Sequence, residues 1–269
     1  MNALLAEWKN TRTPVIGMLH LLPLPGSPLF DGNANRIRDS LLRDADSLAE
    51  GGVDGLMIEN FGDVPFFPGR APSHVVAQIT ALAALVRQRV PNIPLGINVL
   101  RNDGQSALAI AHAVGASYIR VNVLCGARVT DQGVIQGTAH DLLRERAMLD
   151  PKRSIKIFAD VDVKHSAPLA RRDLADEVDD TLERGLADAL IVSGAGTGKA
   201  TDPSQVASVK KSAGDAPVFI GSGVSVNTIS SYLPHCDGVI VGTSLKRDGV
   251  ASNEVDVTRV RELMKRARG

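Results

Sequence analysis

Residues 154–164 read SIKIFADVDVK, a run in which apolar side chains alternate with polar and aromatic ones. Successive side chains of an extended strand point to opposite faces, so this run has two different faces. One face is wholly apolar and consists of Ile155, Ile157, Ala159, Val161 and Val163. The opposite face consists of Lys156, Phe158, Asp160, Asp162 and Lys164. Such a strand needs an apolar layer on one side and partners for its charges on the other.

Seven similar β-branched runs share the chain with this one, and amphipathic helical patterns separate them. The expected strands are residues 14–20, 53–59, 94–100, 117–123, 154–163, 188–193, 217–222 and 237–242. Strands that alternate with helices are typical of βα units around a parallel sheet. Eight units in 269 residues, without a Pro/Gly/Ser-rich linker, predict an α/β fold, a single (β/α)₈ TIM barrel over residues 1–269. Residues 1–12 are expected to form an N-terminal extension, and a doubly wound open sheet is the alternative fold.

In a barrel, one strand face meets the helix layer and the other fills the interior. The apolar faces of residues 94–100 and 117–123 therefore send Asn98, Asn102, Arg120 and Asn122 inward. Buried polar groups cost free energy unless they pair with each other or bind something. We therefore predict a polar pocket at the mouth formed by the carboxyl ends of the strands.

The composition limits the kinds of partner. Thirty basic and thirty acidic residues cancel, which gives no support to binding of nucleic acid or of an anionic membrane. Cys125 and Cys236 lie far apart and form no CxxC motif, so neither a zinc knuckle nor a disulfide framework is indicated. No apolar run reaches the roughly 20 residues of a membrane-spanning helix. We expect a soluble, cytoplasmic protein with a small-molecule partner and no integral membrane segment.

Four ionisable residues are the candidates for proton transfer. His20 and Glu59 end the first two expected strands, and Asp160 and Lys164 come from the fifth. The alternative is structural: His20 bonding a backbone carbonyl and Glu59 capping a loop. A divalent metal held by His20 and the carboxylates is a further alternative, but no HExxH signature is present and we assign no cofactor.

The cluster of Asp160, Asp162, Lys164 and His165 is the densest ionisable group in the sequence. A lysine beside two carboxylates is stabilised as the cation, so we expect a raised pKa for Lys164, which argues against imine chemistry. The alternative is a buried ion-pair network with Arg120. The residues predicted to bind and orient substrate are Asn98, Arg120, Asn122 and Asp162.

Glycine-rich stretches follow the last three strands: SGAGTGK at 193–199, GSGVS at 221–225 and VGTSLK at 241–246. The first is not a Walker A loop, because Ser193 stands where the motif needs glycine and Ala200 follows Lys199. Barrel enzymes frequently hold a substrate phosphate with the loops after strands 7 and 8. The predicted phosphate-binding residues are Gly194, Gly196, Gly221, Ser222, Gly223, Gly242, Thr243 and Ser244. Thr197 or Lys199 is expected to reach in, and tight-turn formation alone is the alternative.

Two long proline-rich loops, residues 21–35 and 61–73, are expected to form a lid over the pocket or a surface for subunit pairing. The Phe66-Phe67 pair in a chain with 3% aromatic residues favours an interface or a substrate wall.

Several runs together resemble the BtpA/SgcQ family over about residues 12 to 265. These runs are PVIGMLHLLPLPGSP, GVDGLMIENFGDVPF, PLGINVLRND, RVNV, DVDVKH, DALIVSGAGTG and DGVIVGTSLKRDG. The resemblance implies a TIM barrel. It also implies a link to photosystem I biogenesis through one cyanobacterial member and to sugar-phosphate metabolism through a bacterial relative. The spread of the family beyond photosynthetic organisms implies a more general role, and no catalytic assignment is carried over.

The leading hypothesis is an enzyme acting on a small phosphorylated metabolite such as a sugar phosphate, by isomerase, lyase or hydrolase chemistry. The second is a non-enzymatic assembly factor for a membrane complex, and a nucleotide triphosphatase is the weakest. Barrels of this kind often form dimers, so a homo-oligomer is compatible with either of the first two hypotheses.

Overall fold

The structure, a computed structural model, describes residues 4–194, 196 and 201–269. Among these residues, eight parallel strands close into a barrel in the order β1-β11-β10-β9-β7-β4-β3-β2. Their bounds are β1 (Val15–His20), β2 (Gly55–Glu59), β3 (Leu95–Asn98), β4 (Tyr118–Val121), β7 (Lys156–Val161), β9 (Ala189–Val192), β10 (Val218–Ile220) and β11 (Gly238–Val241). Each lies within one of the eight runs expected from the sequence, which confirms the barrel.

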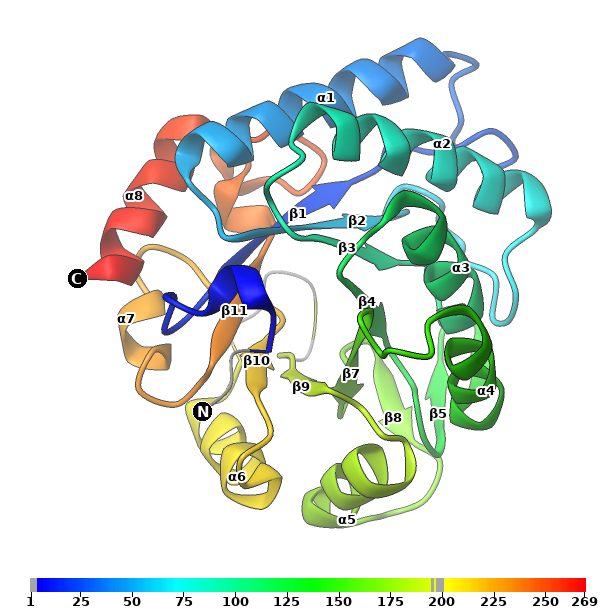
Figure 1. The fold of residues 1–269 in the computed structure, drawn as a ribbon, viewed down its shortest axis with the longest axis vertical. Coiled ribbons are helices and arrows are strands. Elements are labelled where there is room, and N and C mark those ends of the chain that lie inside the picture. The colour runs from blue at the N-terminus through cyan, green and yellow to red at the C-terminus, as the bar shows by residue number, and fades with distance from the viewer. Residues whose placement is uncertain (1–3, 195, 197–200) are drawn as a thin grey trace.

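Helices form a ring around the strands (Figure 1). They are α1 (Ala34–Gly51), α2 (Ser73–Arg89), α3 (Gly104–Val114), α4 (Ala139–Leu149), α5 (Leu174–Asp179), α6 (Pro203–Ala213), α7 (Ile229–Tyr232) and α8 (Val257–Arg268). Helix α5 continues into a π-helical turn, η2 (Asp180–Arg184). The described residues include no helix long and apolar enough to cross a membrane.

The alternation in β7 separates the two apolar layers of the molecule. Ile157, Ala159 and Val161 are buried in the large core between the strands and the helices. Phe158 instead belongs to a second core inside the barrel. This confirms the expected orientation of the strand, because residues of opposite parity enter different cores.

Aromatic rings fill the part of the barrel interior nearest the N-terminal segment. Tyr118, Phe158 and Phe219 pack together with centroid distances of 4.9 Å between neighbouring rings. Gly96 leaves room for one of them, since a Cβ there would lie 2.0 Å from the ring of Tyr118. Glycine in the middle of these strands is therefore required by close packing of the interior.

The N-terminal segment closes this end of the barrel. A short 3₁₀ helix, η1 (Ala6–Trp8), lies across the barrel in Figure 1. Its Trp8 is only 4% exposed, and the indole ring packs against Tyr118, Phe158 and Phe219. The indole N–H donates to the carbonyl of Asp54 at 2.8 Å. The segment predicted as an extension thus completes the interior core.

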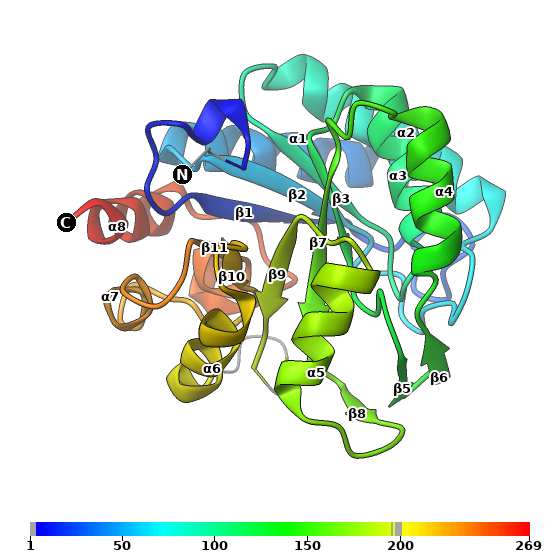
Figure 2. The same cartoon turned by 60° about the horizontal axis from the view of Figure 1, so that its bottom comes forward.

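The sequence analysis missed a small antiparallel sheet. It consists of β5 (Ala127–Thr130), β6 (Gly133–Gln136) and β8 (Ser166–Pro168), paired in the order β6-β5-β8. Figure 2 shows it at the end of the molecule away from η1. Strands of three or four residues produce too short an alternation to stand out in the sequence.

Helical patterns in the sequence end in glycine at Gly51-Gly52, Gly115 and Gly185, which predicts left-handed caps, and two of these three caps are present. Gly52 and Gly115 end α1 and α3 with φ of 86° and 66°. Gly185 has φ of −82°, so that expectation was wrong. A Cβ at Gly185 would lie 2.7 Å from the sulfur of Cys125, so close packing explains this glycine instead.

Candidate functional site at the barrel mouth

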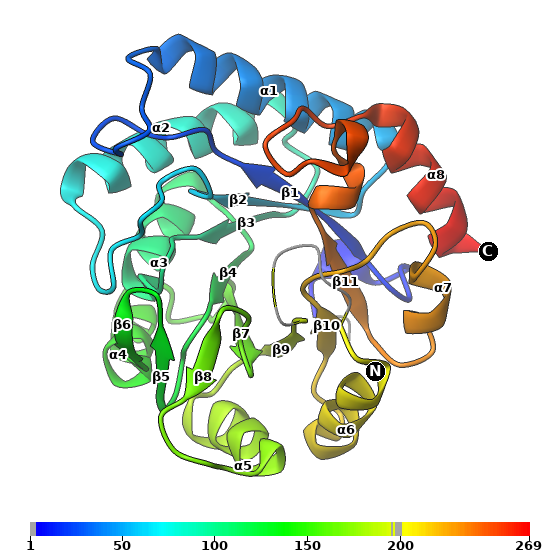
Figure 3. The same ribbon diagram turned by 180° about the vertical axis from the view of Figure 1, so that it is seen from behind.

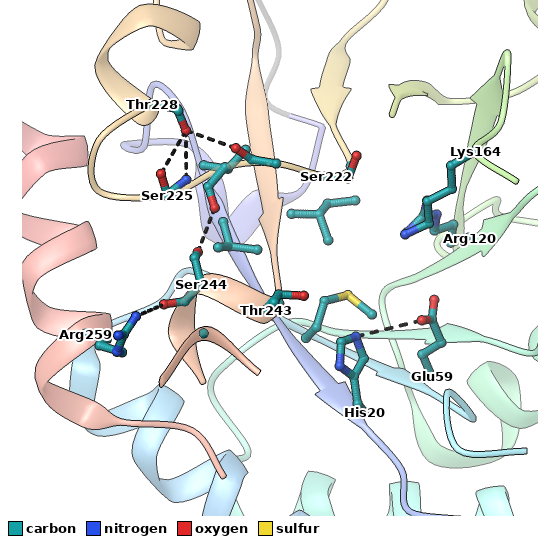
Figure 4. A pocket seen from close by; sticks show the side chains of 18 residues that line it. His20, Glu59, Arg120, Lys164, Ser222, Ser225, Thr228, Thr243, Ser244 and Arg259 are labelled. Atoms are coloured by element: carbon teal, nitrogen blue, oxygen red, sulfur yellow. Dashed lines mark hydrogen bonds and ion pairs between the residues drawn. The ribbon is translucent and has the colours of Figure 1, made fainter. Parts of the chain in front are cut away.

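A cavity of about 390 Å³ opens at the carboxyl ends of the strands, the end that faces the viewer in Figure 3. Its floor is formed by Met18 and Ile240, which cap the interior core. His20, Glu59, Arg120 and Lys164 line one side, and the loops after β10 and β11 line the other. Figure 4 shows these two groups facing each other across the cavity.

His20, Glu59 and Asn98 form one layer of the interior because they are paired in register on three adjacent strands. Residues paired on neighbouring parallel strands point to the same side of the sheet. The Asn98 amide donates to Glu59 Oε2 at 2.6 Å, and His20 Nε2 lies 3.9 Å from Glu59 Oε1. The ring of Phe61 stacks on His20 with a centroid distance of 4.4 Å. His20 and Glu59 line the cavity, while Asn98 holds Glu59 from behind.

Burial lowers the pKa of His20 to about 4, and the positive charges of Lys246 and Lys164 contribute to the decrease. Glu59 and the Ala251 backbone oppose this shift without reversing it. The ring is therefore neutral at neutral pH, when it can accept or share a proton.

Burial by itself raises the pKa of Glu59. The positive charge that His20 carries when protonated, the charges of Lys164 and Arg120, and the Asn98 amide outweigh burial and lower the pKa of Glu59 below its ordinary value. Glu59 is thus a buried carboxylate ready to act as a base or to hold a developing positive charge.

Asp160 forms a two-bond ion pair with Arg120. The Nε and Nη2 atoms of Arg120 each donate to the carboxylate at 2.8 Å, and both side chains are buried. Asn122 adds a third donor at 3.1 Å. Asp160 does not line the cavity, so the arrangement matches the ion-pair alternative and suits Asp160 to positioning Arg120 instead of proton transfer.

Lys164 projects into the cavity and has no ion-pair partner among the described residues. Burial lowers the pKa of Lys164, and the nearby charges of Arg120 and Arg101 lower it further, against the influence of Glu59 and Asp160. The expectation of a raised pKa was therefore wrong. Burial is the main reason, and the two carboxylates expected beside Lys164 do not offset it, because Asp160 is paired with Arg120 and Asp162 points elsewhere.

Asp162 lies outside the barrel interior, contrary to the alternation in the sequence. The strand ends at Val161, and the backbone of Asp162 adopts a φ of 49°. Its carboxylate pairs with Arg128 of β5 and accepts from Gln205 of α6. Asp162 therefore joins the small sheet to the helix layer and does not reach the main cavity.

Asn122 and Asn102 were both expected to point inward, but they have different partners. Asn122 faces the interior and contacts Asp160. Asn102 bridges to the backbone of Val123, accepting from its N–H at 2.7 Å and donating to its carbonyl at 2.9 Å. Asn102 thus links the ends of β3 and β4 and does not line the main cavity.

The loops after β10 and β11 supply backbone amides to the other side of the cavity. Among the residues that the structure describes, no acceptor is present for the N–H groups of Gly223, Val224, Thr243 and Ser244. The Ser244 hydroxyl donates to the Val224 carbonyl at 2.6 Å and ties the two loops together. Thr228 supports the first loop by accepting from the Ser225 N–H. These four residues all line the same cavity, so their N–H groups are candidate donors to an oxyanion bound there.

Arg259 of α8 completes this side and was missed by the sequence analysis. It lines the cavity and donates to the Ser244 carbonyl at 3.2 Å. It forms no ion pair in the part of the chain that the structure describes. One arginine among several in an amphipathic helix carries no signal in the sequence.

Only some of the other predicted phosphate-binding residues line the main cavity. Gly221, Ser222 and Gly242 line the cavity. The Gly194 N–H already donates to Ser222 Oγ at 2.8 Å, so it is not free for a ligand. Gly196 does not line the cavity, and the predictions for Thr197 and Lys199 fall outside the described residues. Within residues 4–194, 196 and 201–269, no group of three or more His, Cys, Asp or Glu side chains is placed to hold a metal ion.

Comparisons with known proteins agree with this fold. The chain is 48% identical to "Uncharacterized protein TK2179" of Thermococcus kodakarensis, over 96% of each chain. It is 47% identical to "Photosystem I biogenesis protein BtpA" of Synechocystis, over 93% of this chain and 86% of that one. N-(5'-phosphoribosyl)anthranilate isomerase from Pyrococcus furiosus shares the architecture, with a TM-score of 0.56 and 13% identity over 95% and 98% of the two chains. A profile of the BtpA family matches residues 11–269, and the chain belongs to the BtpA family.

Proposed function

We propose that this protein is an enzyme that acts on a small phosphorylated metabolite of the sugar-phosphate type. The observation that carries the proposal is the division of one cavity into two chemically different sides. Free backbone N–H groups and Arg259 form one side, and His20, Glu59 and Lys164 form the other.

The donor side suits a phosphate group. Gly223, Val224, Thr243 and Ser244 offer amides without acceptors, and Arg259 adds a positive charge beside them. Backbone N–H groups that converge on one point bind phosphate oxygens without the entropy loss of long side chains. Gly242 lets the His20 ring lie close to this loop, since a Cβ at residue 242 would lie 2.9 Å from that ring.

The opposite side suits proton transfer on the rest of the molecule. Glu59 is ionised and His20 is neutral at neutral pH, so each can take a proton from a bound substrate. The pKa of Lys164 is lowered mainly by burial, which makes its neutral amine accessible for acid–base chemistry or for attack on a carbonyl carbon. Arg120 is held rigidly by Asp160 and can orient a substrate oxygen. These roles fit isomerase, lyase or hydrolase chemistry.

Barrels of the same architecture support the proposal in a general way. The similar structure from Pyrococcus furiosus is named as an isomerase of a phosphoribosyl compound. At 13% identity that likeness concerns the fold, so the substrate class rests on the cavity itself.

Ligand-dependent thermal stability tests the phosphate side. Inorganic phosphate, a panel of sugar phosphates and the corresponding free sugars are added to the purified protein, and the unfolding midpoint is measured. A ligand at 100 times its dissociation constant adds about 2.7 kcal/mol of stability. We expect phosphate esters to raise the midpoint and free sugars to leave it unchanged.

The Arg259→Gln variant tests the same site, with Arg261→Gln as the matched control. Arg261 lies on the same helix but is exposed and pairs with Glu50. Loss of a hydrogen bond to a charged group costs about 1.5–3 kcal/mol, so phosphate affinity should fall about tenfold or more in Arg259→Gln only. Equal affinities in both variants, or stabilisation by free sugars alone, would contradict the proposal.

The name of the Synechocystis relative favours a second candidate, an assembly factor. Under that alternative, the cavity residues are dispensable. A Synechocystis strain lacking its relative, supplied with this chain or with its Lys164→Met variant, separates the two. Equal complementation by both chains would favour the assembly factor.

A further inference from the structure

A second cavity of about 370 Å³ adjoins the main one. Glu59 and Lys164 line both, so the two cavities meet at these side chains. The outer walls of the second cavity are apolar and come from Phe61, Val64, Phe66 and Leu100. Phe66 thus forms a cavity wall, whereas its neighbour Phe67 is 49% exposed.

Arg101 is the unusual residue of this second cavity. It is only 5% exposed, yet it forms no ion pair with any residue that the structure describes. Its one recorded side-chain hydrogen bond is from Nη2 to the Lys164 carbonyl at 2.7 Å. A guanidinium stays protonated in proteins, and burial without a counter-ion is costly. The remaining N–H groups, at the edge of a cavity, are therefore suited to an anion supplied by a ligand.

Asn122 adds a second unsatisfied group to the same cavity. Its Nδ2 donates to the Asp160 carboxylate, which can only accept, so the orientation of the amide is determined. Oδ1 then faces away from Asp160, is buried, and has no hydrogen-bond partner. Asn122 is 2% exposed and lines the second cavity. An acceptor of this kind requires a donor, such as a hydroxyl or an amine.

The charge of the surroundings distinguishes between anions. Glu59 and Asp131 also line the second cavity and repel negative charge. A singly charged carboxylate matches the planar guanidinium and suffers less repulsion than a second phosphate dianion. The apolar walls are compatible with the carbon chain or ring that bears it.

We propose that the substrate is a phosphorylated hydroxy or amino carboxylic acid that spans both cavities. This inference rests on the proposed function, since the phosphate occupies the main cavity. The carboxylate binds Arg101, and a hydroxyl or amine donates to Asn122. The carbon atoms between the two ends then lie against Glu59 and Lys164, the groups suited to proton transfer.

Matched pairs of phosphate esters test the carboxylate. The first pair is 6-phosphogluconate and sorbitol 6-phosphate, and the shorter pair is 3-phosphoglycerate and glycerol 3-phosphate. Within each pair a carboxylate replaces a hydroxymethyl group, and dissociation constants are measured by calorimetry. We expect at least one acid to bind about tenfold or more tightly than the partner that lacks the carboxylate.

Variants of Arg101 test whether this residue causes the preference for the carboxylic acid. Arg101→Gln should abolish the difference within the pair and leave the affinity for inorganic phosphate unchanged. Arg101→Lys should retain part of the difference, because the charge remains without the fork of donors. Arg70→Gln is the control, since Arg70 is exposed and lies in a neighbouring loop. Thermal unfolding of each variant establishes that it is folded.

The outcomes separate the two proposals. Equal affinity of the wild type for both members of each pair would overturn the carboxylate inference and leave the phosphate site intact. The same holds if a folded Arg101→Gln variant still prefers the acid. If neither the esters nor inorganic phosphate bind, the proposed function fails, and the carboxylate inference fails with it.

Discussion

The two ends of the barrel interior are built from the same strands and differ in what fills them. At the η1 end, Trp8, Tyr118, Phe158 and Phe219 pack ring against ring in a fully apolar core. At the mouth, the next inward-facing residues of β4 and β7 are the paired Arg120 and Asp160, and β1 and β2 end in His20 and Glu59. Close packing stabilises the fold, whereas buried charges without partners lower stability and are suited to binding. The contrast indicates that stability and function are segregated along the barrel axis.

The largest effect on stability is expected when the packing of the apolar end is disrupted. Trp8→Ala removes a buried ring from the interior core, and such substitutions cost about 3–5 kcal/mol of unfolding free energy. Chemical denaturation measures the loss, and Trp8→Phe, which retains most of the packing, is the control. Binding of phosphate esters should persist below the unfolding transition. Loss of ligand affinity without loss of stability would show that the two ends are not separate.

A second effect concerns the pH dependence of stability at the mouth. The pKa of His20 is lowered by burial from 6.5 to about 4, so the unfolded chain binds a proton between these values and the folded chain does not. The stability of the fold is therefore complete above pH 6.5 and decreases as pH falls toward 4. At pH 4.5 the expected loss is about 2–3 kcal/mol relative to pH 7.

The His20→Asn variant is the comparison for that measurement, because it cannot titrate in this range. Its unfolding free energy should change less between pH 7 and pH 4.5 than that of the wild type. Parallel pH profiles of the two proteins would mean that His20 is not held neutral in the folded state.

The smallest effect on the free energy of unfolding is expected for a substitution of Lys164, and it should be an increase. Lys164→Met replaces a half-buried amine, which has no ion-pair partner among the described residues, by an apolar chain of similar length, so stability should stay within about 1 kcal/mol and tend to increase. Affinity for phosphate esters should fall. Denaturation and calorimetry on the same sample measure both quantities, and a variant that is clearly destabilised would place Lys164 with the structural residues.

Some of the site followed from the sequence because strand alternation is a local property. The ends of β1 and β2 had to bring His20 and Glu59 to the mouth, and Arg120 and Asn98 had to point inward. The loops after β10 and β11 were recognisable from their glycines and their place in the order of the strands. Asp162 was misplaced because alternation ends where the strand ends, and a positive φ turned its side chain outward.

The sequence by itself therefore determined the barrel, the sidedness of its strands and the end at which polar groups collect. These properties depend on residues close together along the chain. The tertiary structure decided which charges pair, since Arg120 and Asp160 are far apart in sequence and meet only across neighbouring strands. Burial in the assembled interior is the main cause of the lowered pKa of Lys164, and the neighbouring Arg120 lowers it further. Among the described residues, Arg101 and Arg259 line the cavities without an ion-pair partner. Pairing and burial are properties of the assembled interior, which no local pattern contains.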